Sequence, residues 1–495
     1  MQKISITNTM TGKKEPLVLN DPSSNHIGIY ACGVTVYDDC HIGHAMQAIY
    51  FDVIRNFFEY VGYKVTYVRN YTDVDDKIIA RAKERGISPL QLSASVIESS
   101  IRDMKAIGVR PATFEPKVSE SISDIISMTQ KIIENGMAYA TASGDVYFRV
   151  RKKQDYGKLS NRKPDDMRSG TRDIVVGEKE YELDFALWKA DSTADGSWPS
   201  PWGQGRPGWH IECSAMALKT LGASFEIHGG GRDLVFPHHE NEIAQSEAAN
   251  CCGYAKYWIH SGLLTIDHQK MSKSLGNHIT IQKFLEKWPP EVLRLGFLTN
   301  HYQSNIDFSL QVFQTCLKRL LYYYETLNSL DQFAEQFAHD LKGGLTKEQK
   351  SKEPAKSVID AFVSAMSDDF NSAKALGEMN KSFKTAKDLV AGKKSSQKQQ
   401  DAAYLSAALK EIGSVLGLFR GDVQQEILRL KRQVLPDLGV TENEIEQAIA
   451  KRLAARASKD FATSDAVRDD MAKRGIEIRD TPQGSVWSIK FNLEE

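Results

Sequence analysis

Hydrophobic positions near the N-terminus follow two periods, one typical of a strand and one of a helix. Residues 27–31 form a short apolar run suited to a buried strand, and Gly33 and a polar turn follow it. From His41 onward, apolar residues recur every four positions in two adjacent columns, which predicts a helix with one wide buried face that ends at Gly62. Residues 65–69 predict a second strand. This order of elements is typical of nucleotide-binding α/β domains.

The pattern changes at residues 137–207, which are rich in charge, Gly and Pro. We interpret this stretch as an insertion that splits the first domain. The α/β order then resumes with a predicted helix at 208–221, a strand at 224–228 and a tight turn at Gly229-Gly230-Gly231. A further strand is predicted at 258–267.

Beyond Phe284 the apolar spacing is helical. Two polar stretches, 341–357 and 391–400, are predicted to be flexible linkers without chemistry. A last unit mixes basic helices with an extended tail. The predicted segments are 1–136, 137–207, 208–268, 269–310, 311–421 and 422–495.

Composition narrows the class of protein. A chain of 495 residues is expected to form about three domains. Lys and Arg total 63 against 64 for Asp and Glu, so a nucleic-acid partner would have to bind a local patch. Six cysteines without a CxxC pair do not form a disulfide framework and suit a reducing compartment. No stretch approaches ~18 apolar residues and no apolar leader is visible, so we expect a cytoplasmic protein that does not engage a membrane.

Two short motifs have the chemistry of a phosphate site. His41-Ile42-Gly43-His44 falls in the first turn of the predicted helix, where unpaired N–H groups and the dipole attract phosphate. A histidine pair at a helix start is also compatible with a simple cap. Lys270-Met271-Ser272-Lys273-Ser274 is a polar loop whose lysines can neutralise a departing pyrophosphate, although most charged runs are merely solvated. The two motifs together are a far more specific signal for a phosphate site than either motif alone.

A third group of residues has the chemistry of a metal site. His238 and Glu242 are four apart and share one face of a predicted helix, a spacing that alone usually marks a surface pair. Cys32 and Cys213 both lie in the sequence context of a strand end, which strengthens the case for a metal site. Two thiolates, an imidazole and a carboxylate would suit Zn²⁺, but their spread along the chain makes the set weak from spacing alone.

The motifs resemble those of the cysteinyl-tRNA synthetases, a class I family, from near the N-terminus to the tail. The segments that carry the resemblance are YACGVTVYDDCHIGH, TDVDDKI, DFALWK, GRPGWHIECSAM, HGGGRDLVFPHHENEIAQSEAA, KMSKSLGN and ARASKDFATSDAVRDDM. The resemblance implies an α/β fold: a Rossmann-like parallel-sheet catalytic domain split by a connective insertion, then an α-helical bundle and a small mixed C-terminal domain. Residues 269–310 would hold the KMSKS loop and contact the tRNA stem, and residues 422–495 would bind the anticodon.

The resemblance also implies roles for single residues. The family's zinc ligands fall on Cys32, Cys213, His238 and Glu242, giving one zinc per chain. His41, His44, Lys270 and Lys273 would be catalytic, and His41, Gly43, His44 and Lys273 would contact ATP. Gly33, Thr35 and Trp209 would bind the substrate, although Trp209 is equally compatible with a core position.

Three positions depart from the family pattern. Val34 stands where the family usually has Pro, and Tyr71 replaces the usual apolar residue before TDVDD. HYQSNIDFS at 301–309 differs from the common NYRSPLDFS. None of these changes removes a reacting group, so they bear on rates and not on the reaction.

The physical chemistry agrees with the resemblance. Cysteine differs from serine by one atom, and shape alone discriminates poorly between near-isosteres. A zinc ion favours a soft thiolate over a hydroxyl. The expected partners are L-cysteine, ATP with Mg²⁺, and tRNA(Cys), and we expect a monomer. In the implied reaction the cysteine carboxylate attacks the ATP α-phosphate, and the terminal ribose of the tRNA then attacks the adenylate.

Two other functions are compatible with parts of the pattern. One is a ligase that passes activated cysteine to a small amine; such relatives lack the C-terminal unit. Basic residues in the tail argue against it, namely Arg452, Arg456, Lys459, Arg468, Lys473 and Arg474. The other is a non-catalytic RNA-binding or zinc-storage protein, against which the intact HIGH and KMSKS motifs argue.

Overall fold

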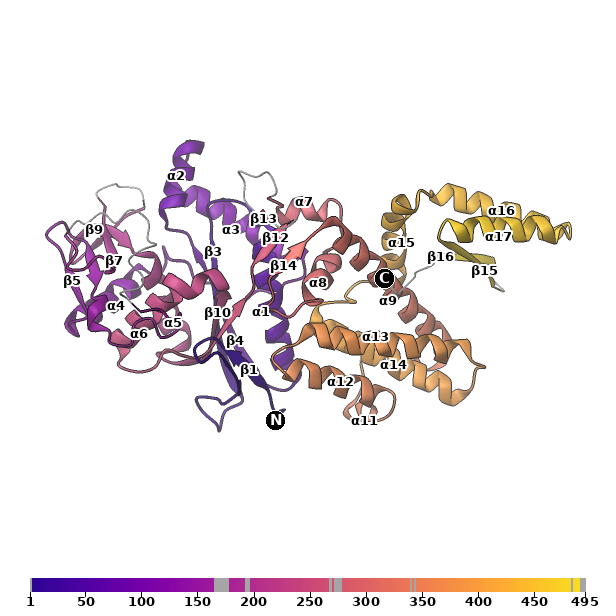
Figure 1. Ribbon diagram of the computed structural model, residues 1–495, viewed down its shortest axis with the longest axis horizontal. Helices are drawn as coiled ribbons and strands as arrows, with labels where there is room; N and C mark the ends of the chain where they lie inside the picture. The colour runs from indigo at the N-terminus through magenta and orange to yellow at the C-terminus, as the bar shows by residue number, and fades with distance from the viewer. Residues whose placement is uncertain are drawn as a thin grey trace. The chain divides into compact units, whose positions relative to one another are not determined.

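The computed structural model describes residues 2–163, 178–191, 196–266, 269–270, 278–338, 341, 344–481 and 484–489. The chain forms two compact units, whose elements are labelled in Figure 1. The first comprises Met1–Phe284, Phe297–Phe308 and Val363–Ala375; the second comprises Leu285–Gly296, Ser309–Phe362 and Leu376–Glu495. None of the helices in the described ranges is long and apolar enough to cross a membrane.

A four-stranded parallel sheet forms the centre of the first unit. Its order is β11-β10-β3-β4, and its strands are β3 (His26–Thr35), β4 (Lys64–Thr72), β10 (Phe225–Gly231) and β11 (Ala255–Ser261). The chain leaves β3 toward β4 on one side and returns later as β10 on the other. The ends of β3 and β10 therefore meet at a point where the strand order reverses, which is the position where α/β sheets bind their ligands.

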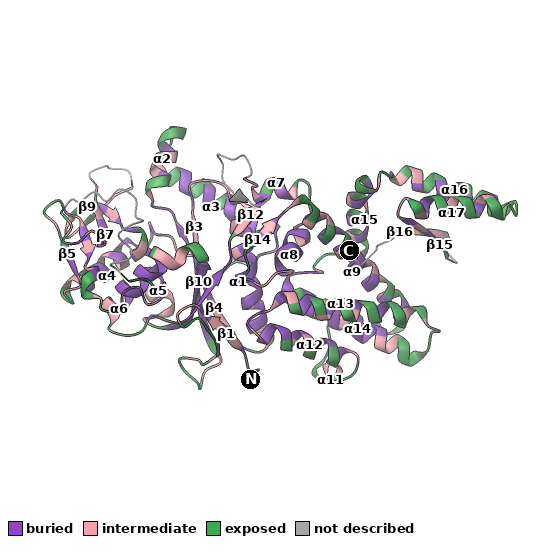
Figure 2. Ribbon diagram, viewed as in Figure 1, coloured by how far each residue is buried: buried purple, intermediate pink, exposed green. Residues whose placement is uncertain are grey.

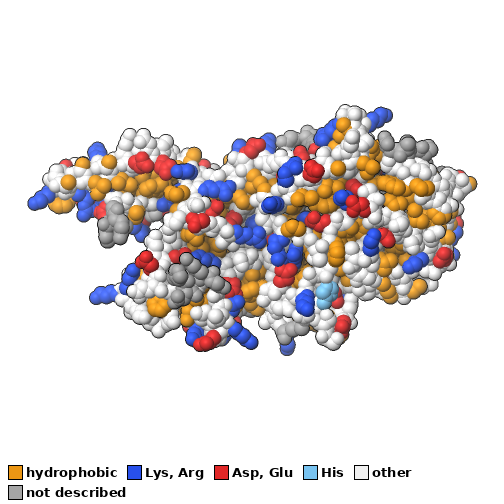
Figure 3. Space-filling view, turned by 180° about the vertical axis from the view of Figure 1, so that it is seen from behind, with side chains coloured by type: hydrophobic (Ala, Val, Ile, Leu, Met, Phe, Trp, Pro, Cys, Tyr) orange, Lys and Arg blue, Asp and Glu red, His pale blue; other side chains and the backbone are white. Residues whose placement is uncertain are grey.

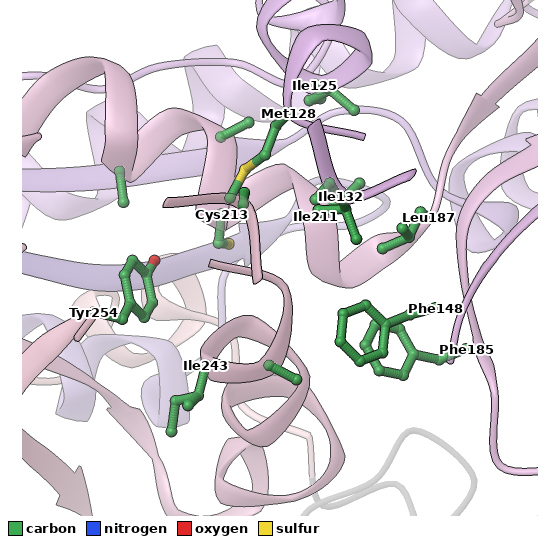
Figure 4. Close-up of a cluster of buried hydrophobic side chains, with 14 of the residues drawn as sticks. Ile125, Met128, Ile132, Phe148, Phe185, Leu187, Ile211, Cys213, Ile243 and Tyr254 are labelled. Carbon is green, nitrogen blue, oxygen red and sulfur yellow. The ribbon is translucent and has the colours of Figure 1, made fainter. Parts of the chain in front are cut away.

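Helices cover both faces of this sheet, as predicted for an α/β domain. Helix α1 (Ile42–Tyr60) buries both of its predicted apolar columns, and a Cβ built at Gly229 of β10 would lie 2.2 Å from its Phe51 side chain. On the other face, Tyr30 and Cys32 of β3 share a buried cluster with α4 (Ile122–Glu134), α5 (Trp209–Leu221) and α6 (Glu240–Asn250). Figure 4 labels isoleucines of this cluster from each of the three helices, among them Ile125, Ile211 and Ile243. Helices α2 (Asp76–Arg85) and α3 (Pro89–Ala106) follow β4.

Strand β3 is longer than the apolar run predicted, because it continues through Gly33 to Thr35. Its pairing with β4 shifts register between Ala31 and Val34. At this bulge the backbones come so close that a Cβ on Gly33 would lie 1.6 Å from the Asn70 carbonyl oxygen. Gly33 is therefore required by backbone packing.

The predicted tight turn at Gly229-Gly230-Gly231 is wrong. These three residues belong to β10 and pair with Ile259, His260 and Ser261 of β11. Glycine is used here because neighbours approach the strand closely: a Cβ on Gly229 would also lie 2.7 Å from the Ile259 carbonyl oxygen, and a Cβ on Gly230 would lie 2.8 Å from the Leu234 side chain. The triplet indicates close packing and not a change of direction.

Residues within 137–207 form a separate antiparallel sheet of order β5-β6-β7-β9-β8. Its strands are β5 (Ala138–Ala140), β6 (Val146–Phe148), β7 (Phe185–Ala190), β8 (Trp198–Ser200) and β9 (Gly203–Pro207). Two smaller sheets complete the first unit. One is the hairpin of β1 (Ser5–Asn8) and β2 (Lys13–Pro16), and the other contains β12 (Leu264–Ile266), β13 (Gln269–Lys270) and β14 (Ile306–Phe308). The single strand predicted at 258–267 is thus two strands in different sheets, and residue 267 lies outside the described residues.

The remaining helices lie mostly in the second unit. They are α7 (Ile281–Leu285), α8 (Pro290–Leu298), α9 (Leu310–Phe333), α10 (Glu335–Ala338), α11 (Lys347–Lys350), α12 (Ala355–Ser367), α13 (Ser372–Ala391), α14 (Ser396–Leu416), α15 (Val423–Val434), α16 (Glu442–Ala457) and α17 (Phe461–Lys473). A hairpin of β15 (Ile476–Thr481) and β16 (Gly484–Ile489) follows. Figure 2 shows extensive exposed surface along α16 and α17.

The polar stretches predicted as linkers are partly helical. Helix α14 begins at Ser396, where the Ser395 side chain accepts a hydrogen bond from the backbone N–H of Lys398. Gln and Lys are good helix formers, and their polarity fits an exposed first turn. On the face shown in Figure 3, Lys and Arg are interspersed with Asp and Glu, as the balanced composition predicts.

Candidate metal and substrate site

The four predicted metal ligands meet near the carboxyl end of β3. Cys32 comes from that strand, Cys213 from α5, His238 from the kinked segment Val235–His239 that precedes α6, and Glu242 from α6. The two sulfur atoms lie 3.8 Å apart, and Cys32 Sγ lies 3.4 Å from Glu242 Oε1. His238 Nε2 lies 3.0 Å from the same oxygen. All four side chains are buried.

This arrangement fits a zinc ion. Two sulfur ligands at a Zn–S distance of about 2.3 Å in a tetrahedron lie about 3.8 Å apart, which matches the separation of the cysteines. Two thiolates, one imidazole and one carboxylate are donors that zinc accepts together. The elements that bring them together are a strand end, two helix starts and a turn, so the sequence spacing carries little of this information.

The electrostatics of the cluster favour anionic ligands. The Cys32 thiol, which contacts Cys213, lowers the pKa of Cys213 to about 6 despite burial. Burial alone raises the pKa of Glu242, but His228 and His238 hold it well below its usual range. Burial and the contact with Cys213 raise the pKa of Cys32. The cluster therefore stabilises the thiolate of Cys213 and the carboxylate of Glu242 although both side chains are buried.

Further histidines surround the ligands, and sequence reasoning did not identify them. His210 Nδ1 lies 3.0 Å from His238 Nδ1, which leaves Nε2 of His238 facing the cluster. His239 Nε2 lies 3.3 Å from Cys32 Sγ, and its Nδ1 contacts His260 at 2.8 Å. A second possible ligand group is Cys32, His228, His239 and Glu242. It shares two members with the first group but has a single thiolate, so the first group is the softer site.

Three of these histidines lie next to a residue or motif that we had identified from the sequence. His210 and His239 each adjoin a residue that we had singled out, Trp209 and His238, and His228 precedes the glycine triplet. Only the fold shows that they converge on one cluster.

Trp209 lies beside the candidate metal ligands. It is 39% exposed and stacks on His238 with ring centroids 4.4 Å apart. A core position is thereby excluded. Gly33, also predicted to bind substrate, lies beside the cluster and donates its N–H to Asn70 Oδ1 at 2.9 Å, while Thr35 ends the same strand.

Helix α1 connects the HIGH motif to the cluster of candidate metal ligands. Gln47, one turn into the helix, donates a hydrogen bond to the Cys32 carbonyl oxygen at 2.7 Å. A cavity of about 20 Å³ is lined by residues of both regions, including Cys32, Gly33 and His44.

The first turn of α1 differs from the expectation of unpaired N–H groups. His41 is the N-cap, and its Nδ1 accepts from the N–H groups of Gly43 and His44 at 3.1 and 3.4 Å. The two imidazole rings stack at 3.7 Å. Burial, and to a lesser extent His278, lowers the pKa of His41 to about 4, and burial also lowers that of His44. Both histidines are therefore neutral at pH 7.

The KMSKS motif is only partly described. The backbone of Lys270 ends β13, which pairs with β12. Lys273 lies outside the described residues.

Comparison with known proteins agrees with this geometry. Residues 19–318 match the family model of the class I (C) tRNA synthetase catalytic domain, and residues 361–420 match the DALR domain. The fold is shared with solved synthetases: a Mycobacterium tuberculosis methionyl-tRNA synthetase in complex with methionyl-adenylate has a TM-score of 0.56 at 15% identity, covering 85% of this chain and 95% of that one. A putative arginyl-tRNA synthetase from Campylobacter jejuni has a TM-score of 0.52 at 13% identity, covering 79% and 93%. These findings define the class: a class I aminoacyl-tRNA synthetase.

Curated relatives narrow the class to one family. Cysteine–tRNA ligases from Trichlorobacter lovleyi and Geobacter metallireducens are each 46% identical, over 489 and 492 residues, covering 98% of this chain and 100% of each relative. The chain belongs to the cysteine–tRNA ligase family.

Proposed function

We propose that this chain activates L-cysteine with ATP and transfers it to the terminal ribose of tRNA(Cys). Family membership over nearly the whole chain supports the reaction, and the buried cluster of two cysteines, a histidine and a glutamate supports the choice of amino acid. The full-length match, including the DALR domain, favours a tRNA over a small amine as acceptor.

The cluster would hold one zinc ion through Cys32, Cys213, His238 and Glu242. When bound, zinc supplies a soft acceptor for the substrate thiolate, which a serine hydroxyl does not match. Trp209 would cover the bound amino acid, and Gly33 and Thr35 would line the strand end beneath it. Gln47 of α1 donates a hydrogen bond to the Cys32 carbonyl oxygen, which would hold this part of β3 against the helix.

The phosphate chemistry would be carried by the two motifs. His41 and His44, with the backbone at Gly43, would bind the ATP phosphates at the start of α1. Lys270 and Lys273 would neutralise the departing pyrophosphate, together with Mg²⁺ on the nucleotide. No nucleophilic side chain is needed, because the substrate carboxylate attacks the α-phosphate and the ribose attacks the adenylate.

The domain roles extend the same proposal. The two halves of the parallel sheet, 1–136 and 208–268, would form the catalytic domain, with 137–207 as its connective insertion. Residues 269–310 would contact the tRNA stem, 311–421 would form the helical bundle, and 422–495 would bind the anticodon. We propose that the enzyme acts as a monomer.

The buried cluster carries the proposal, and its metal content tests it. Purified protein should contain one zinc per chain by elemental analysis, and Cys213→Ala should lose most of it. Cys316→Ala is the matched control, because Cys316 is also a buried free cysteine but lies on α9. Absence of metal, or full zinc content in Cys213→Ala, would refute the proposed site.

A further inference from the structure

The two oxygens of Glu242 have different surroundings. Oε1 faces the cluster, with Cys32 Sγ at 3.4 Å and His238 Nε2 at 3.0 Å. Oε2 is turned away from these groups and has two partners of its own. They are Tyr254, whose hydroxyl donates at 3.1 Å, and His228, whose Nε2 lies at 2.9 Å.

Packing holds Tyr254 in one orientation. The residue lies just before β11 and is 3% exposed. Its ring contacts Phe225 edge-on at 5.2 Å and His228 at 5.5 Å. Figure 4 shows its hydroxyl directed toward the side on which Cys213 lies. A phenol fixed by aromatic neighbours is a well-positioned hydrogen-bond donor.

His228 supports the same oxygen from a second direction. The ring stacks on Trp258 with centroids 4.5 Å apart. Its Nδ1 is buried without a hydrogen-bond partner in the described structure, while Nε2 faces Glu242. The proton therefore belongs on Nε2, where it is donated to the carboxylate. Oε2 thus accepts two hydrogen bonds from rigid donors.

We propose that Tyr254 is a positioning residue that keeps Oε2 of Glu242 out of the metal's coordination sphere, so that Glu242 binds through Oε1 alone. The inference rests on the proposed zinc site. A carboxylate that bound through both oxygens would occupy the position that the substrate thiolate needs. Groups that orient metal ligands in this way typically change metal affinity about 10- to 100-fold when they are removed.

The variant Tyr254→Phe removes only the hydroxyl. Its matched control is Tyr257→Phe on β11, because Tyr257 is also 3% exposed and its hydroxyl bonds the Pro16 carbonyl oxygen at 2.8 Å, away from the cluster. The first measurement is the rate at which each zinc-loaded protein releases zinc to a chromophoric chelator. The second is the visible absorption spectrum after Co²⁺ replaces zinc, which reports the number of ligands.

The Co²⁺ spectrum of Tyr254→Phe should change toward a higher coordination number, because Oε2 is then free to bind, and its zinc release rate should differ from wild type by about 10-fold or more; neither should change in Tyr257→Phe. If the wild type holds one zinc but Tyr254→Phe shows the wild-type rate and spectrum, the role of Tyr254 is refuted and the zinc site stands. Equal acceleration in both variants also refutes it, because the effect would then be general loosening. A wild type without zinc overturns both proposals.

Discussion

Cys32 shows how single residues connect the two halves of the site. Its sulfur contacts Cys213 and Glu242 in the cluster of candidate metal ligands, while its carbonyl accepts a hydrogen bond from Gln47 on the helix that begins with the HIGH motif. One residue at a strand end thus links the group that would recognise the amino acid to the helix that would bind ATP. A small displacement of Cys32 should therefore affect both the binding of the amino acid and the position of helix α1.

Lys273→Ala should slow adenylate formation on the order of 10²-fold while the KM for cysteine changes little. A cation that meets charge as pyrophosphate separates acts mainly on the transition state. ATP–pyrophosphate exchange at saturating ATP measures the effect, and Lys283→Ala on α7 serves as control. An unchanged rate in Lys273→Ala would show that this lysine is not part of the site.

His41 should make the folded protein less stable in acid. Because its pKa is lowered to about 4 from an ordinary value near 6.5, the unfolded chain binds a proton between these values that the folded chain excludes. The free energy of unfolding should therefore fall as the pH is lowered through this range. Asn is also a good N-cap, so His41→Asn should keep the helix start and lose less stability on acidification.

Urea denaturation at pH 7 and pH 5 measures this difference, with the exposed His26→Asn as control. The account of His41 fails if wild type and His41→Asn lose the same free energy of unfolding between the two pH values.

At the scale of elements, the predictable features were those set by local periodicity. The columns of α1 and the strands β3 and β4 follow directly from apolar spacing, as does α5. Close approaches between distant segments were not predictable. The glycines of β10 were interpreted as a turn because the helix and the strand that require them are remote in sequence.

Gly229→Ala should destabilise the protein by about 1–3 kcal/mol, because the new methyl group overpacks the contact between β10 and Phe51. Gly253→Ala, where no atom lies within 4 Å of the added Cβ, is the control. Chemical denaturation compares the two variants. Equal stability of both would contradict the packing that we assign to this strand.

At the scale of the whole molecule, the candidate ligands could be predicted from the sequence and the residues around them could not. The four candidate ligands, which the fold brings together, were predicted from motifs, whereas the surrounding residues His210, His228, His239 and Tyr254 were visible only in the fold. In the C-terminal tail, several of the basic residues form ion pairs with acidic residues of the same tail. Arg452 and Arg456 both pair with Asp480, and Arg474 pairs with Glu444 at 3.0 Å. Much of the positive charge that suggested tRNA binding is thus neutralised within the tail.

Removing residues 441–495 should leave ATP–pyrophosphate exchange near normal while tRNA charging falls through weaker tRNA binding. This boundary retains α15, whose Lys431 pairs with Glu325 of α9 at 3.3 Å, so the helices before it keep their partner. A second contact far from the acceptor end of a tRNA would fix its register. Charging that survives intact would refute the anticodon-binding role, and a joint loss of both activities with unfolding would make the tail structural.

The central claim is that a zinc ion in the buried cluster selects cysteine for activation by binding the thiolate of the substrate. ATP–pyrophosphate exchange should be measured with cysteine and with serine, before and after a chelator removes the metal. The zinc-loaded protein should strongly prefer cysteine, and the preference should collapse in the zinc-free protein and return when zinc is restored. A preference for cysteine that persists unchanged without zinc would contradict the account.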